Sequence, residues 1–165
     1  AHTALFVSIL QDCIDTFDIE VHAFCFLSNG YHLLIKTPRG NLSQAMRQLN
    51  GMYTQRFNKE QALDGPLFKG RYRATVLEKN YLLPISRFID LQPVTHKLVE
   101  QPSQYKWSSY RAHIGKPSKM PWLQTKEIAA LSDDYQTFIH QGIDPEIDSF
   151  YKKKNICRFM HYTKG

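Results

Sequence analysis

The sequence predicts an α+β protein with a ferredoxin-like antiparallel sheet, helices on one face of the sheet, and a helical C-terminal extension. Two observations predict it: apolar spacing gives the order helix, hairpin, helix, strand, helix over residues 4–91, and an Asn-Gly pair joins two β-rich runs. This order lacks the first strand of a ferredoxin-like unit. We therefore expect that strand to be missing, disordered or replaced by another chain.

The first helix and the hairpin follow from local patterns. Residues 4–17 carry apolar side chains every four positions: Leu5, Ile9, Cys13 and Phe17. Residues 19–27 and 31–37 are rich in β-branched and aromatic side chains, as strands are. Asn29 and Gly30 lie between them, and a type I′ turn needs a positive φ at both central positions. The hairpin turn is therefore predicted to centre on Asn29-Gly30.

The second half of the predicted unit is a helix, a strand and a short helix. Asn41 or Ser43 can cap a helix that extends to Phe57, because apolar residues recur there at helical spacing. After the Gly-Pro break at 65–66, residues 67–77 are predicted to form a strand. Asn80 then caps a short helix over residues 81–91, closed by a proline at 93.

We divide the chain into a domain over residues 1–115 and a polar, helical extension over residues 116–165. The 165 residues are 42% hydrophobic, which is enough to fold, and contain no internal repeat. The cysteines Cys13, Cys25 and Cys157 are odd in number and widely spaced, so we expect all three to be reduced and structural.

The charge of the chain favours a polyanionic partner. Lys and Arg number 21 against 15 Asp and Glu, a net charge of +6, which makes nucleic acid the first candidate and an anionic membrane the second. No run approaches the roughly 20 apolar residues of a membrane span. The first residues lack the basic leader of a signal peptide, so we expect a cytoplasmic protein.

A row of cations identifies the predicted strand over residues 67–77 as a candidate DNA contact. Alternation places Lys69, Arg71 and Arg73 on one face, with Tyr72 opposite them in the core. Three cations in a row suit a phosphate backbone, although a solvated strand edge is the alternative.

Several blocks of the sequence resemble one known family. In chain order they are VHAFCFLSNGYHLLIKTPRGN, GPLFKGRYRATVLEKNYLLPISRFIDLQPV and YKWSSYRAHIG. They are similar to the REP-associated tyrosine transposases, a branch of the single-tyrosine HUH superfamily, over roughly residues 3–115. The resemblance implies a DNA-acting protein that takes hairpins with a flanking single strand. It leaves a monomer and a homodimer both open.

The resemblance implies a metal site that is incomplete here. The family carries a His-hydrophobic-His motif on the strand after the turn. The two imidazoles hold Mg²⁺ or Mn²⁺ together with an amide on the short helix of the nucleophile, four residues beyond it. This chain has Gly30 at the first histidine position, His32 at the second, and Gln92 at the amide position. We therefore expect metal binding to be weak or absent. We also expect His32 and Gln92 to face one another, with Phe88 in the same pocket.

The resemblance also implies a tyrosine nucleophile that is absent here. In the family, a tyrosine in a pattern like R-Y-I-x-L-N-P attacks a DNA phosphorus and forms a 5′-phosphotyrosine. Phe88 occupies this position and has no oxygen. Tyr81, two helical turns earlier and roughly 10 Å away along the axis, is a poor substitute. We also count Arg87, next to the nucleophile position, among the DNA-binding residues.

Three functions stay open at this point. The first is a degenerate family member that binds DNA with impaired nicking and joining, and the second is an active transposase that uses a substitute tyrosine. The third is an RNA-binding ferredoxin-like module, which would need an RNP-type aromatic pattern, and the sequence has none. Replacing tyrosine by phenylalanine at residue 88 is also a change that would be engineered to trap a complex. Replacing histidine by glycine at residue 30 is not such a change.

Overall fold

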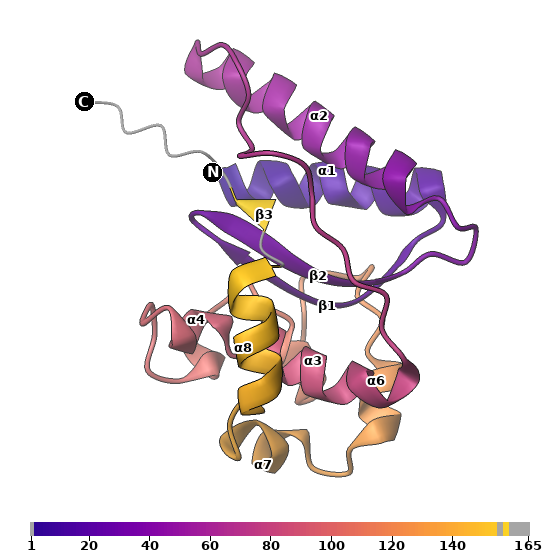
Figure 1. Ribbon diagram of the computed structural model, residues 1–165, viewed down its shortest axis with the longest axis vertical. Helices are drawn as coiled ribbons and strands as arrows, with labels where there is room; N and C mark the ends of the chain where they lie inside the picture. The colour runs from indigo at the N-terminus through magenta and orange to yellow at the C-terminus, as the bar shows by residue number, and fades with distance from the viewer. Residues whose placement is uncertain (1, 155–156, 159–165) are drawn as a thin grey trace.

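The structure is a computed structural model that describes residues 2–154 and 157–158. It has three layers, with a small antiparallel sheet between two long helices on one face and a group of shorter helices on the other (Figure 1). The α+β class predicted from the sequence is confirmed. No helix among these residues is long and apolar enough to cross a bilayer.

The sheet has the order β1-β2-β3. Strand β1 (Glu20–Leu27) pairs antiparallel with β2 (Gly30–Lys36), as the hairpin prediction requires. Strand β3 (Cys157–Arg158) pairs antiparallel with the first two residues of β2. The predicted turn was wrong by one residue: Leu27 pairs with Gly30, so the turn residues are Ser28 and Asn29. Asn29 does not have the positive φ of a type I′ turn.

A β-bulge at His22 changes which face of the sheet the β1 side chains enter. The register shifts between Val21 and Ala23, so Val21 shares a core with Phe24 rather than with Ala23. Both faces of the sheet are covered, and every β1 residue after Glu20 is buried. This double burial explains why the strand is almost wholly apolar instead of alternating.

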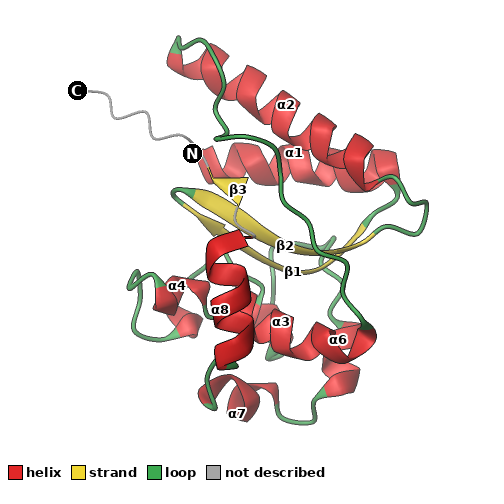
Figure 2. Ribbon diagram, in the orientation of Figure 1, coloured by secondary structure: helices red, strands yellow, loops and turns green. Residues whose placement is uncertain are grey.

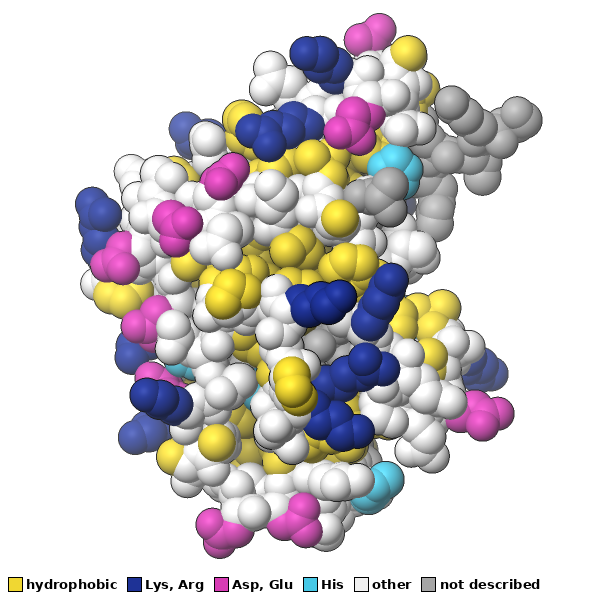
Figure 3. Space-filling view, turned by 180° about the vertical axis from the view of Figure 1, so that it is seen from behind, with side chains coloured by type: hydrophobic (Ala, Val, Ile, Leu, Met, Phe, Trp, Pro, Cys, Tyr) yellow, Lys and Arg dark blue, Asp and Glu magenta, His cyan; other side chains and the backbone are white. Residues whose placement is uncertain are grey.

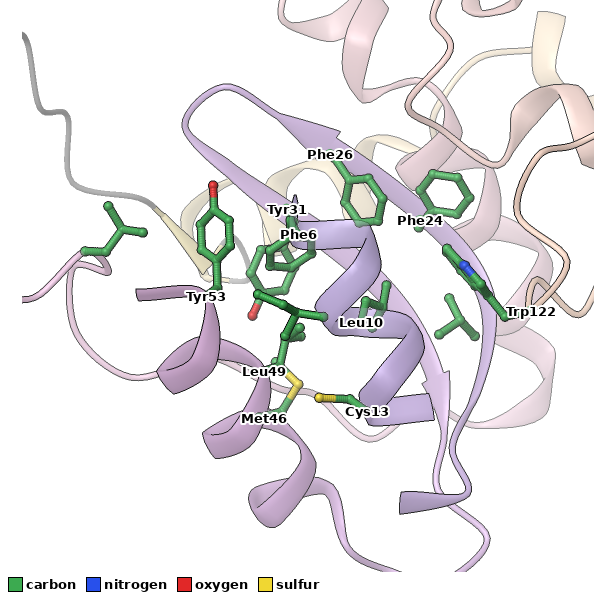
Figure 4. Close-up of a cluster of buried hydrophobic side chains, with 13 residues drawn as sticks. Phe6, Leu10, Cys13, Phe24, Phe26, Tyr31, Met46, Leu49, Tyr53 and Trp122 are labelled. Atoms are coloured by element: carbon green, nitrogen blue, oxygen red, sulfur yellow. The ribbon is translucent and has the colours of Figure 1, made fainter. Parts of the chain in front are cut away.

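The first face is covered by α1 (His2–Phe17) and α2 (Leu42–Gln61), the two helices of the ferredoxin-like unit. Figure 4 shows side chains from these helices converging on the hairpin. The buried cluster includes Phe6, Leu10, Cys13, Phe24, Phe26, Tyr31, Met46, Leu49, Tyr53 and Trp122. Trp122 comes from beyond residue 115, so the C-terminal part contributes to this core.

The opposite face is covered by short elements that follow residue 78 (Figure 2). They are η1 (Lys79–Tyr81), α3 (Leu82–Asp90), α4 (Gln92–Thr95), η2 (Pro102–Gln104), α5 (Tyr110–His113), α6 (Lys126–Leu131), α7 (Tyr135–His140) and α8 (Pro145–Lys154). Their apolar residues form a second core with Ala23, Cys25, Leu27 and Leu34 of the sheet. The helical extension was predicted; its packing under the sheet was not.

The outer edge of β1 is paired with the C-terminal part of the chain. Phe26 N donates to Trp107 O at 2.9 Å, Ser109 N donates to Phe24 O at 2.9 Å, and Gln124 N donates to Val21 O at 2.9 Å. These bonds satisfy backbone groups that an exposed edge strand would leave open. Residues 107–124 are therefore part of the same folded unit as the hairpin.

The strand predicted over residues 67–77 was wrong, because this segment forms no strand ladder. In a ferredoxin-like sheet this segment pairs with the first strand, and the described residues contain no such strand. Without that partner the segment stays extended but unladdered. Its side chains still divide as expected: Lys69, Arg71 and Arg73 are exposed, and Tyr72 packs half-buried on the core.

Candidate functional site

The sheet and α3 bring His32 and Phe88 into contact. Alternation along β2 sends His32 and Leu34 to the face that α3 covers. Phe88 lies on the apolar side of α3, and its ring meets the His32 ring edge-to-face, with centroids 5.6 Å apart at 87°. Gln92, at the start of α4, is buried, and its Nε2 donates to Phe88 O at 2.9 Å.

His32 is a buried, neutral histidine. It is 7% exposed, and its Nε2 has no hydrogen-bond partner among the described residues. Burial, and to a smaller extent the charge of His96, lower the pKa of His32 to about 4. At neutral pH this imidazole therefore carries an uncommitted ring nitrogen.

The residues around His32 do not complete a metal site of the kind the resemblance implies. Gly30 offers no side-chain donor, and the amide nitrogen of Gln92 is already used by the Phe88 carbonyl. One imidazole and one amide oxygen are left, whereas hard divalent ions take about six oxygen-type ligands. The Nε2 of His32 is available instead for a hydrogen bond.

A second cluster of metal-type ligands was not foreseen, and two of its members, His22 and Glu127, line the same cavity as His32. One ligand atom each of Glu20, His22 and Glu127 lie within 4.8 Å of one another. A cation is already there: Lys36 Nζ is 3.2 Å from Glu127 Oε1 and 3.9 Å from Glu20 Oε2. The ammonium group of Lys36 thus offsets part of the charge of the two carboxylates. Glu20 and His22 alternate on a strand, but nothing in the sequence brings Glu127 to them.

His32 and Phe88 line a cavity of about 460 Å³. Its walls come from β2, the extended segment 72–77, α3 and α8, and they are mainly apolar. Its charged lining consists of Arg73 and Lys79 and of the paired Lys36 and Glu127, so cations outnumber the one carboxylate.

Of Tyr81 and Tyr151, only Tyr151 lines the cavity. Tyr81, the substitute suggested by the sequence, ends η1, is 45% exposed and is not among the lining residues. Tyr151 on α8 does line the cavity, and its ring centroid is 5.6 Å from that of Phe88. No sequence pattern pointed to Tyr151, because only tertiary packing brings α8 to α3.

The predicted DNA-binding residues fall into two groups. Lys69, Arg71 and Arg73 are exposed. Arg87 is 8% exposed, with its Cζ 3.9 Å from the centre of the Phe138 ring and its Nη1 donating to Phe138 O at 3.1 Å. Burial, the largest influence, lowers the pKa of Arg87. Arg87 therefore anchors α7 to α3 instead of facing solvent with the other three.

Charged side chains are unevenly spread over the surface. Figure 3, which shows the molecule from behind, has Lys and Arg side chains gathered around the middle of that face and Asp and Glu side chains toward its edges. The net charge of +6 is thus partly concentrated. A concentrated positive region raises the local concentration of an anionic partner.

Asp90, on the turn of α3 that carries Phe88, is the centre of a buried polar network. It has no exposed surface and accepts bonds from His113 Nδ1 at 2.6 Å and from the Tyr135 hydroxyl at 2.7 Å. The Ser109 hydroxyl also donates to it. Three helices, α3, α5 and α7, are tied together in this way.

His113 completes the network as an imidazolium. Its Nε2 donates to the backbone carbonyl of His22 at 2.8 Å, so both ring nitrogens are donors. Burial alone would lower the pKa of His113, but the charge and hydrogen bond of Asp90 outweigh burial and raise it. The ion pair locks α3, and with it Phe88, against the bulge of β1.

The comparison with protein families bears on this geometry. The sequence model of the family described as "Transposase IS200 like" matches residues 3–92, more than half of the chain. The chain belongs to the IS200-like transposase family. The match contains Gly30, His32, Phe88 and Gln92, and it ends before His113, Tyr135 and Tyr151. No curated protein and no solved structure matches the chain.

Proposed function

We propose that the protein is a DNA-binding transposase of the REP-associated branch that recognises a hairpin with a single-stranded flank, and that strand cleavage through residue 88 is lost. The observation that carries this proposal is Phe88 itself. Its ring lies against His32 in the cavity, at the position of the family nucleophile, and brings no oxygen to attack phosphorus.

Binding does not need the missing oxygen. Phosphate contacts and base stacking supply most of the affinity of single-stranded DNA sites, and both depend on cations and aromatic rings. Lys69, Arg71 and Arg73 are exposed on one segment, and Arg73 also lines the cavity. This placement supports a path for the DNA backbone along residues 69–73 toward Phe88.

The test is a fluorescence anisotropy titration of a labelled DNA hairpin with a single-stranded flank at several salt concentrations. Replacing Lys69, Arg71 and Arg73 by Ala should lower the affinity and reduce the slope of log affinity against log salt by about 2, since each single-strand phosphate contact contributes about 0.7. Unchanged affinity and slope would remove this segment from the interface.

A matched control separates local contact from net charge. Lys116, Lys119 and Lys126 are also exposed, and replacing them by Ala removes the same three positive charges. This control should keep most of the affinity. An RNA hairpin of the same sequence provides the second comparison: RNA binding as tight as DNA binding would favour the RNA-binding alternative.

A further inference from the structure

The cavity has lost the phenol of residue 88 but not every phenol. Tyr151 reaches it from α8, and its ring lies against Phe88 with centroids 5.6 Å apart at 45°. His32 contacts the same Phe88 ring, also at 5.6 Å. The Phe88 ring is thus flanked by an imidazole with an uncommitted nitrogen and by a tyrosine.

We propose that Tyr151 is the residue through which this protein forms a covalent bond with DNA. The inference rests on the proposed function, because it requires a single DNA strand to enter the cavity. It replaces Tyr81, which is more exposed and does not line the cavity. Tyr151 lies outside the residues matched by the family, so this role would be particular to the chain.

The chemical step is an in-line displacement at phosphorus. The phenolic oxygen of Tyr151 forms the new bond to phosphorus, and the bond from phosphorus to the 3′ oxygen of the preceding nucleotide breaks. The phenolic proton passes to solvent, and the leaving oxygen takes a proton from water to become a 3′ hydroxyl. Arg73 and Lys79, which line the same cavity, can offset charge on the phosphate.

The surroundings of Tyr151 predict a slow reaction. Burial, the largest influence, and the nearby Tyr81 raise the pKa of Tyr151, although its hydrogen bond with Thr75 opposes the shift. The phenol is therefore protonated at neutral pH. His32 is a weak base, since its pKa is about 4. Adduct formation should accelerate as the pH rises.

The experiment incubates the full chain with end-labelled hairpin DNA carrying single-stranded flanks, with and without magnesium or manganese. Covalent adducts are resolved on denaturing gels, and the modified peptide is identified by mass spectrometry. We expect an adduct on Tyr151. Tyr151→Phe, which keeps the ring, should reduce it at least about tenfold, whereas Tyr81→Phe should leave it within about twofold.

DNA affinity is measured for each variant by the anisotropy assay, and the loss of adduct in Tyr151→Phe should exceed any loss of affinity. An adduct on another residue, or one that persists in Tyr151→Phe, overturns the role of Tyr151. DNA binding without any adduct overturns the same role and leaves the binding function standing. Absence of DNA binding overturns the proposed function and this inference together.

Discussion

Two buried histidines, His32 and His113, lie on either side of α3 and have opposite electrostatics. His113 is bonded at both ring nitrogens, and the charge of Asp90 raises its pKa. His32 is just as buried, its Nε2 has no partner in the part of the chain that the structure describes, and its pKa is about 4. Burial is common to both, so the partner decides the protonation state.

The difference separates scaffold from site. A buried, fully satisfied ion pair holds elements in one arrangement. A buried nitrogen without a partner lowers the stability of the fold, so its presence calls for an explanation other than folding. The Asp90 network therefore serves to hold α3 in place. The His32 side of α3, with its cavity and tyrosine, is where binding and chemistry are expected.

The largest expected effect comes from breaking the scaffold. His113→Gln removes the imidazolium and leaves the Asp90 charge buried, which should lower the free energy of unfolding by about 3–5 kcal/mol. Urea unfolding measures it, with Asp90→Asn and the double variant completing a mutant cycle. If the double variant loses as much free energy of unfolding as the two single variants together, the two groups do not act as a pair.

The stability lost in His113→Gln should also depend on pH. Because the pKa of folded His113 is raised above its ordinary 6.5, its stabilising contribution is complete below pH 6.5 and is lost as the pH rises through the folded value. The stability gap between wild type and His113→Gln should therefore narrow at high pH.

The contribution of His32 to stability should depend on pH in the opposite direction to that of His113. The pKa of His32 is about 4 in the folded protein and 6.5 ordinarily, so the unfolded chain takes up a proton first as the pH falls. About 3 kcal/mol of stability should be lost between pH 6.5 and pH 4, from about 1.4 kcal/mol per pKa unit. Comparing wild type with His32→Asn isolates this loss. Parallel pH profiles for the two proteins would contradict it.

A smaller effect is expected from Tyr135→Phe, which removes one donor to Asp90 and keeps the ring. A hydrogen bond to a charged group contributes about 1.5–3 kcal/mol, so thermal unfolding should show a loss in that range. Tyr72→Phe is the control, because its hydroxyl bonds the exposed, uncharged Ser43 at 3.0 Å. Equal losses of stability in the two variants would mean that the hydrogen bond to buried Asp90 contributes no more than the exposed one to Ser43.

The smallest expected effect is a change in adduct formation on the other side of α3. There, Phe88→Tyr restores the phenol that the family resemblance implies. Made in a Tyr151→Phe background, this change should recover little adduct, since the imidazole at residue 30 is still missing. Adding Gly30→His should give more than the two single gains combined, because nucleophile and metal ligands act as one unit. Denaturing gels with magnesium or manganese decide it. Full recovery by Phe88→Tyr alone would contradict it.

Local sequence patterns predicted the hairpin and the helices well. Apolar spacing located α1 and α2, and the β-rich runs located β1 and β2. The turn type and the strand at residues 67–77 were wrong. Strand formation needs a partner edge, and no local pattern says whether that edge is present.

The sequence by itself determined that this chain folds as an α+β unit. Its family resemblance predicts that Phe88 and Gly30 occupy the positions of a nucleophile and a metal ligand. Only the tertiary structure decided what surrounds them. Arg87 became an anchor under α7, His113 paired with Asp90, and Tyr151 reached the Phe88 ring from α8. These contacts join residues far apart in the chain, so packing of the C-terminal helices against the sheet determines them and local spacing does not.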